Sequence, residues 1–323
     1  MLKTSPKPIC AFNVSSEGGC ERIVAPLGPK IELPATGYLW LHFDLNDANL
    51  EPWIEQVLPR TAARALLQPE TRPRCDRLED GMILTLRGVN LNPGADPNDM
   101  VSVRLWIQEG LIVSARARKI WAVDAIRQKM ETGVGPESIG AFLAELTYGL
   151  TKRIEKVSLD LVEGTDAVED SAMSQVQRVS GELSALRHSV IKIRRFVRPQ
   201  TEAIADLSSG STWTFEPHQR DVLKEVANRA VRTMEELDAT SDRLHVIQEH
   251  LDMLHATTLG RNSYVLSVVA AIFLPLGFLT GLFGINVGGM PGLDSRYGFL
   301  AVTGGSAFLG LVLYAVFRRL KWL

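Results

Sequence analysis

The stretch Tyr264–Phe283 reads YVLSVVAAIFLPLGFLTGLF and contains no charged side chain. A second uncharged stretch, FLAVTGGSAFLGLVLYAVF, covers Phe299–Phe317. Each stretch has about the 20 residues that an α-helix needs to cross a bilayer core about 30 Å thick. A pair of buried helices in a large soluble core is the alternative, but core helices are usually shorter than this. The two stretches therefore predict two membrane-spanning helices.

Cationic residues flank the two predicted spans on one side. Arg261 precedes the first span, and Arg318, Arg319 and Lys321 follow the second, whereas the connecting loop holds one acidic and one basic residue. Lys and Arg are retained on the cytoplasmic side of membranes. We therefore expect a multi-pass protein of the cytoplasmic (inner) membrane with both termini in the cytoplasm.

The composition excludes several classes of protein. The 323 residues carry a net charge of −2 and are 46% hydrophobic, so no basic field favours nucleic acid as a partner. Three scattered cysteines exclude a disulfide scaffold. The sequence has no P-loop, no Gly-x-Ser-x-Gly elbow and no His-Glu-x-x-His motif. We therefore expect neither an enzyme nor a bound cofactor.

Residues 1–135 carry the pattern of a mixed α/β domain. Runs typical of strands occur at 38–45, 82–91, 100–107 and 111–117, and runs typical of helices at 50–58 and 119–130. The segment NPGADPND separates two of these strands and consists of strong turn formers. The sequence thus predicts a cytosolic α/β domain that precedes the membrane spans.

Residues 136–216 are predicted to form a long helix hairpin. We expect two helices with a break near Gly164–Ser171, and we expect Pro199 to end the second helix. The region around the break is acidic, with Glu155, Asp160, Glu163, Asp166, Glu169 and Asp170. These acids are interpreted as a solvated hairpin tip, and a specific cation site is the alternative.

Residues 217–283 are predicted to form a stalk helix that continues into the first span at about residue 262. Between Pro217 and Gly260 the sequence contains no Gly or Pro. Apolar or small residues recur every three or four positions, at Leu223, Ala227, Ala230, Met234, Leu237, Ser241, Leu244 and Leu251. A helix of about 66 residues is about 100 Å long. One small domain cannot stabilise such a helix, so we expect neighbouring copies of the chain.

One face of the stalk can be followed through the membrane by steps of three and four residues. It contains Gly281, Gly277, Leu274, Ala270, Leu266, Ser263, Leu259, Ala256, Asp252, Glu249 and His245. Several copies around an axis would form a narrow apolar conduit above rings of carboxylates that attract cations. A solvated helix face is the simpler interpretation of Glu249 and Asp252. A coordinating site of His245, Glu249 and Asp252 is a further alternative.

The loop that follows the first span, residues 284–298, begins with Gly284-Ile285-Asn286 and continues with Gly288-Gly289-Met290-Pro291. Here the chain resembles the CorA-type divalent metal-ion transporters, whose signature Gly-Met-Asn stands at the outer end of the first of two C-terminal spans. The sequence Gly-Ile-Asn followed by Gly-Gly-Met-Pro is similar to the zinc-transporting ZntB branch of that family. The position of the triplet is the specific feature, because a long helix precedes it and a second span (299–317) and a basic tail (318–323) follow.

The resemblance implies an arrangement of subunits. It implies a homopentamer in which the first span lines a central pore, the second span packs outside it, and the cytosolic domains form a funnel with the long helices. Gly284, Ile285 and Asn286 take the position of the outer selectivity filter. Ile285 replaces the methionine of the signature, and the acidic residues that often follow it in magnesium transporters are absent. The resemblance therefore favours Zn²⁺ as the transported cation.

The chemistry of the loop agrees with weak binding of the cation. A ring of Asn286 oxygens and backbone carbonyls offers neutral ligands, which suit a hydrated divalent ion. The loop contains no Cys or His, so a tight tetrahedral zinc site is excluded there. Zinc uptake coupled to protons is implied by the resemblance, but neither span contains a carboxylate or histidine as a relay. The alternatives are a Mg²⁺, Co²⁺ or Ni²⁺ channel gated by cytosolic ions, and a membrane-anchored signalling scaffold.

Overall fold

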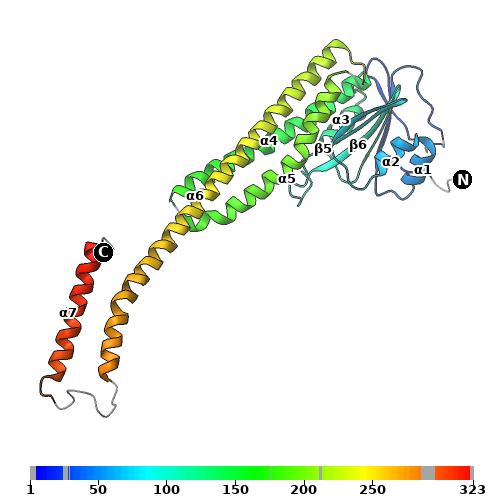
Figure 1. Cartoon of the computed structure of the whole chain (residues 1–323). Coiled ribbons are helices and arrows are strands. Elements are labelled where there is room, and N and C mark those ends of the chain that lie inside the picture. Colours follow the sequence, from blue (N-terminus) through cyan, green and yellow to red (C-terminus); the bar gives the residue numbers. More distant parts are fainter. Residues whose placement is uncertain are drawn as a thin grey trace. The chain divides into compact units, whose positions relative to one another are not determined.

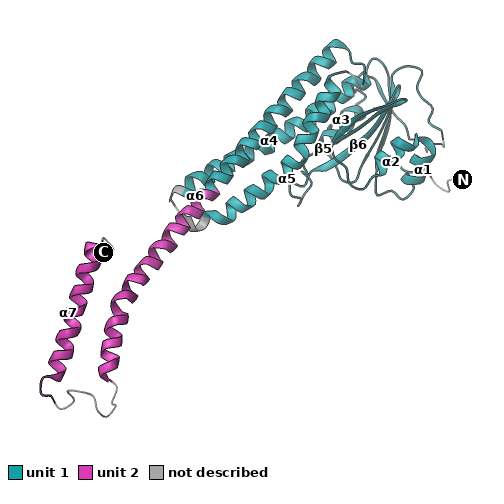
Figure 2. Ribbon diagram, in the orientation of Figure 1, with its two compact units in different colours: residues 1–247 teal, residues 248–323 magenta. Residues whose placement is uncertain are grey.

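The computed structural model describes residues 5–24, 28, 30–174, 176–210, 213–284 and 295–320 (Figure 1). Residues 1–247 and 248–323 form two compact units, which Figure 2 colours separately. The first unit contains a sheet and most of the helices. The second unit contains the C-terminal part of one long helix and one further helix.

A seven-stranded sheet lies at the centre of the first unit. Its strands are β1 (Cys10–Val14), β2 (Cys20–Arg22), β3 (Tyr38–Asp44), β4 (Arg74–Leu78), β5 (Gly81–Gly88), β6 (Val101–Gln108) and β7 (Leu111–Arg116). The strand order is β2-β1-β3-β7-β6-β5-β4. Neighbouring strands are antiparallel except β3 and β7, which are parallel, with Trp40 opposite Ile112. The parallel pair joins an N-terminal group of three strands to a four-stranded meander.

Helices cover both faces of this sheet. Helices α1 (Leu50–Val57) and α2 (Arg60–Leu67) share a core with Leu41 and Phe43 of β3. Trp40 points to the other face, because successive side chains of a strand alternate. The core on that face includes Trp40 and residues of α3 (Trp121–Glu131), α4 (Ile139–Ser174) and α5 (Val176–Ser208). The predicted α/β domain is therefore confirmed as a three-layer arrangement.

The predicted strands and short helices are all present, but four elements were not predicted. Strands β1, β2 and β4 and helix α2 are short, and β2 and β4 are the edge strands of the sheet. Strand β4 reads RCDRL and lacks the apolar alternation of an interior strand. Such a segment becomes a strand because a neighbouring strand is available for pairing.

The helix hairpin differs from the prediction in two places. Helix α4 passes through the expected break at Gly164–Ser171 and ends at Ser174. Helix α5 continues past Pro199 to Ser208. Its last turns carry Ile204 and Leu207, which are fully buried in the core. Packing of this apolar face therefore outweighs the backbone hydrogen bond that proline removes.

Helix α6 (Pro217–Gly284) has 68 residues and confirms the predicted long stalk. Most of its predicted apolar seam is buried within the first unit, namely Leu223, Ala227, Ala230, Met234, Leu237 and Leu244. This part of the seam is therefore covered by the chain itself and does not require a second copy. Helix α7 (Gly298–Arg319) contains the second predicted span. Both α6 and α7 are long and apolar enough to cross a membrane.

Candidate functional site

The predicted pore-facing residues of the first span all belong to α6. Gly281, Gly277, Leu274, Ala270, Leu266, Ser263 and Leu259 share one continuous helix, so their spacing places them along one face. Six of the seven are exposed in the single chain, and Ala270 is half-buried. Leu266 and Leu274 expose 70% and 71% of their surface. We call these seven residues the α6 stripe.

A different face of the same helix segment is shielded. Val268 is only 6% exposed, and Ile272, Pro275, Leu276 and Leu279 are half-buried. The other described helix of this unit is α7, which Figure 1 shows next to the C-terminal part of α6. At 3.6 residues per turn, the α6 stripe is rotated by about 160 to 240° from Val268. The stripe therefore lies on the side of α6 opposite the shielded face.

The α6 stripe consists of small or apolar residues and carries no charge. A Cβ atom added at Gly277 or Gly281 would meet nothing within 4 Å. The nearby hydroxyls bond to their own helix, since Ser267 donates to the carbonyl of Ser263 (2.9 Å) and Thr280 donates to that of Leu276 (3.0 Å). The stripe thus offers a narrow apolar wall to whatever lies beside it.

The acidic part of the predicted face is exposed. Asp252 accepts a hydrogen bond from the Gln248 amide at 2.9 Å, and Glu249 is exposed one turn away. His245 lines a cavity of about 150 Å³ between α5 and α6, together with Arg187. Over the ranges that the structure describes, no three His, Cys, Asp or Glu side chains could hold a metal ion. His245, Glu249 and Asp252 therefore do not form the alternative coordinating site within one chain.

Glu155, Asp166 and Glu169 of the predicted hairpin tip are paired with arginines. Arg229 of α6 donates to both carboxylate oxygens of Glu155, and Arg243 contacts Asp166 at 2.6 Å and also Glu169. These three carboxylates are therefore neither simply solvated nor free for a cation, because guanidinium groups of α6 bind them. The pairs connect α4 to α6.

The predicted selectivity filter lies mostly outside the described residues. Gly284 is the last residue of α6 and is exposed. Ile285 and Asn286 fall in the undescribed segment 285–294. Their role therefore stays a prediction from the sequence.

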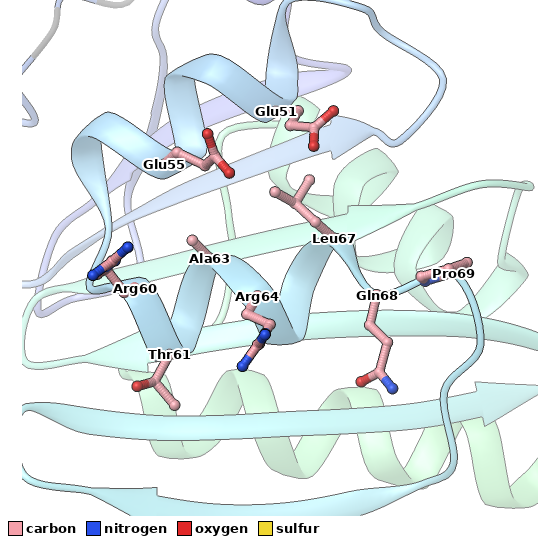
Figure 3. Close-up of a pocket in the computed structure, with 9 residues that line it drawn as sticks. All are labelled: Glu51, Glu55, Arg60, Thr61, Ala63, Arg64, Leu67, Gln68 and Pro69. Atoms are coloured by element: carbon pink, nitrogen blue, oxygen red, sulfur yellow. The ribbon is translucent and has the colours of Figure 1, made fainter.

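A cavity of about 1080 Å³ lies on the outer helices of the first unit and contains no predicted site residue (Figure 3). Glu51 and Glu55 of α1 stand on one side of it, and Arg60 and Arg64 of α2 line it as well. This groove could not be predicted from the sequence, because its charged residues resemble any solvated helix surface.

A buried polar network crosses the centre of the sheet at His42. Arg116 donates to Nε2 of His42 at 3.1 Å, so Nδ1 carries the proton and donates to Ser114 Oγ at 2.8 Å. Trp40 also donates to Ser114 Oγ at 2.8 Å. Burial and the nearby Arg116 cation lower the pKa of His42 to about 3. Burial likewise raises the pKa of Cys10, which lies opposite His42 in the sheet, to about 12. Both groups are therefore neutral near pH 7.

Comparisons with known proteins agree with this architecture. Residues 35–319 match the family described as CorA-like Mg²⁺ transporter protein. The chain is 33% identical over 322 residues to the "Zinc transport protein ZntB" of Pectobacterium carotovorum, with 97% of this chain and 95% of that protein covered. It is also 33% identical over 324 residues to the "Divalent cation transporter CmaX" of Pseudomonas aeruginosa, with 98% and 96% covered.

Solved structures show the same fold. The full-length CmaX protein matches with a TM-score of 0.80 at 31% identity and with complete coverage of both chains. The cytoplasmic domain of ZntB from Vibrio parahaemolyticus matches with a TM-score of 0.66 at 24% identity, covering 78% of this chain and 99% of that domain. The α/β domain, the long helix and the two apolar helices are thus those of a transporter, and the predicted resemblance is confirmed. The chain belongs to the family of CorA-like Mg²⁺ transporter proteins, which handle divalent cations, and within it to the ZntB-like branch.

Proposed function

We propose that this chain transports Zn²⁺ across the cytoplasmic membrane as a homopentamer, in which the α6 stripe of each subunit lines a central pore. The observation that carries the proposal is the position of the stripe, which is exposed in the single chain and lies opposite the shielded face of α6. Five such helices around an axis would place α7 outside and the stripe inside. The related proteins named for zinc transport supply the choice of cation.

The ion path follows from the groups along the stripe. The neutral oxygens of Asn286, together with Gly284 and Ile285, form the outer filter and hold a hydrated cation through its water shell. Along the wall beyond it the only side-chain oxygen of the stripe is the Ser263 hydroxyl, so the cation keeps most of its water and can leave again. Glu249 and Asp252 attract the cation at the inner end. His245 stands beside Arg187 and contributes less to that attraction.

The proposal includes an orientation and an organisation of the chain. Both termini and the α/β domain lie in the cytoplasm, residues 284–298 form the outer loop, and the subunits together form a funnel. The segments 1–135, 136–216, 217–283, 299–317 and 318–323 act as α/β domain, helix hairpin, stalk with first span, second span and basic tail. No cofactor takes part. A proton gradient drives uptake only if a group outside the two spans relays the proton.

The filter is tested by replacing Asn286 with Ala in protein reconstituted into liposomes that contain a Zn²⁺-sensitive dye. We expect at least a tenfold loss of flux, because the ring loses its side-chain oxygens. Asn262→Ala, at the other end of the first span, is the control and should keep the wild-type rate. Unchanged flux in Asn286→Ala would refute the filter.

The stripe is tested by cysteine substitution at two leucines of α6. In Leu274→Cys the thiol lies on the stripe, whereas in Leu276→Cys it lies on the shielded face. A positively charged thiol reagent should block flux through the first variant and leave the second active. Equal block of both variants, or of neither, would refute the assignment of the pore face. A native mass measurement of the purified particle tests the number of five subunits.

The choice of cation is tested separately, because one relative is named only for divalent cations. Flux of Zn²⁺, Mg²⁺, Co²⁺ and Ni²⁺, with and without a pH gradient, should show Zn²⁺ as the best substrate. A preference for Mg²⁺, Co²⁺ or Ni²⁺ would favour the alternative channel. Complete absence of flux would favour a signalling scaffold instead.

A further inference from the structure

Three arginines of the second unit have no described carboxylate partner. Arg261 of α6 and Arg318 and Arg319 of α7 are exposed, and none forms an ion pair with the residues that the structure describes. By contrast, Arg229 and Arg243 of the first unit are both paired. We call Arg261, Arg318 and Arg319 the basic cluster.

The members of the basic cluster lie at a similar depth. Arg261 stands 23 residues before the end of α6, and Arg318 stands 20 residues after the start of α7. At about 1.5 Å per residue these positions are about 35 and 30 Å from the outer ends of the two helices. A bilayer core is about 30 Å thick, so all three guanidinium groups reach the same membrane surface.

The residues next to the basic cluster also suit a membrane surface. Tyr264 lies one turn from Arg261 on the span side, and Tyr314 lies one turn from Arg318 on the span side. They expose 44% and 49% of their surfaces. Tyrosine is enriched where the acyl chains meet the headgroups. The two tyrosines therefore place the cluster at the level of the headgroups.

Acidic residues are far from the basic cluster. Residues 253–284 and 295–320 contain no Asp or Glu. The nearest carboxylate on α6, that of Asp252, is nine residues from Arg261, or about 14 Å along the helix. This distance exceeds the screening length of about 8 Å at physiological ionic strength. The charge of the cluster is thus not compensated along its own helix.

We propose that Arg261, Arg318 and Arg319 bind the headgroups of anionic phospholipids at the membrane surface where α6 enters and α7 leaves. A guanidinium group can donate two parallel hydrogen bonds to a phosphate, and the net negative charge of the headgroup adds attraction that a zwitterionic lipid lacks. This proposal rests on the membrane placement of α6 and α7 proposed above, and the orientation given there identifies the leaflet as the cytoplasmic one.

The test measures which lipid the purified protein retains. The full-length protein is reconstituted in an equal mixture of dioleoyl-phosphatidylglycerol and dioleoyl-phosphatidylcholine, extracted in mild detergent, and examined by native mass spectrometry. We expect retention of phosphatidylglycerol over phosphatidylcholine by about fivefold for each arginine engaged, which corresponds to about 1 kcal/mol per cation near a charged surface. The combined variant R261Q, R318Q and R319Q should retain both lipids equally.

Matched controls separate the proposal from its alternatives. Arg296→Gln removes a cation near the outer end of α7 and should leave the ratio unchanged. Replacement of the three arginines by Lys should keep a reduced preference, which shows that the fold survives changes at these positions. Soluble glycerol phosphate in excess should not displace the lipid, since it lacks the acyl chains. Equal retention of the two lipids by the wild type, or an unchanged ratio in the triple Gln variant, would overturn the proposal. No cation flux is measured, so the result is independent of the transport experiments.

Discussion

Acid should destabilise the α/β unit through His42, and the size of the effect can be estimated from the structure. The pKa of this buried imidazole is lowered to about 3, whereas an unfolded chain has a His pKa of about 6.5. Below about pH 6.5 His42 is protonated in the unfolded state but stays neutral in the folded state. The contribution of His42 to the free energy of unfolding is therefore fully present above the pKa of the unfolded state. It is lost as the pH falls toward the pKa of the folded state. Between about pH 7.5 and pH 5 the loss amounts to about 2 kcal/mol.

The variant His42→Gln isolates this contribution. A Gln side chain can accept from Arg116 and donate to Ser114, but it does not titrate. Urea unfolding in detergent, followed by tryptophan fluorescence, reports mainly on the first unit, since five of the six tryptophans lie in residues 1–247. The unfolding free energy of the wild type should fall by about 2 kcal/mol more than that of the variant over this pH range. Parallel pH profiles would refute the assignment of a neutral, buried His42.

Three further changes have expected outcomes. Gly37→Ala should destabilise the first unit by more than about 1 kcal/mol in the same urea assay, because φ is +80° there and a Cβ would lie 1.9 Å from the Val14 carbonyl oxygen; wild-type stability would contradict this. Arg243→Gln should cost less than about 1 kcal/mol, since its ion pairs are 41% exposed or more, and a larger loss would show that the pairs are effectively buried. The double change Glu249→Gln and Asp252→Asn should slow Zn²⁺ flux severalfold at low ionic strength and much less at high salt, in the liposome dye assay. A salt-independent effect would argue against electrostatic attraction.

The fold was predictable where the sequence has a strong period or a long apolar run. The interior strands β3, β5, β6 and β7 and the uninterrupted helix α6 were predicted close to their observed bounds. The edge strand β4 was not, because its charged residues carry no strand pattern until β5 is present to pair with it. The continuation of α5 past Pro199 was missed for a similar reason, since buried contacts of Ile204 and Leu207 decide it.

The candidate site was predictable in part. Helical spacing alone grouped the stripe residues, and the structure adds that the opposite face of the helix is shielded. The pairing of Glu155 with Arg229 could not be foreseen, because the two residues are 74 positions apart in the sequence. The network at His42 was also missed, since a single histidine in a strand gives no indication of its partners on β7.

The order of the two units along the chain has a consequence for biosynthesis. The parallel pairing of β3 with β7 requires residues up to Arg116, whereas the first apolar run begins about 150 residues later. At roughly 5 to 20 residues per second, the ribosome needs roughly 7 to 30 s to synthesise that interval. The sheet can therefore close before the first of the two candidate spans has been translated. A variant that slows sheet closure should then expose its unfinished core to cytosolic proteases before the protein reaches the bilayer.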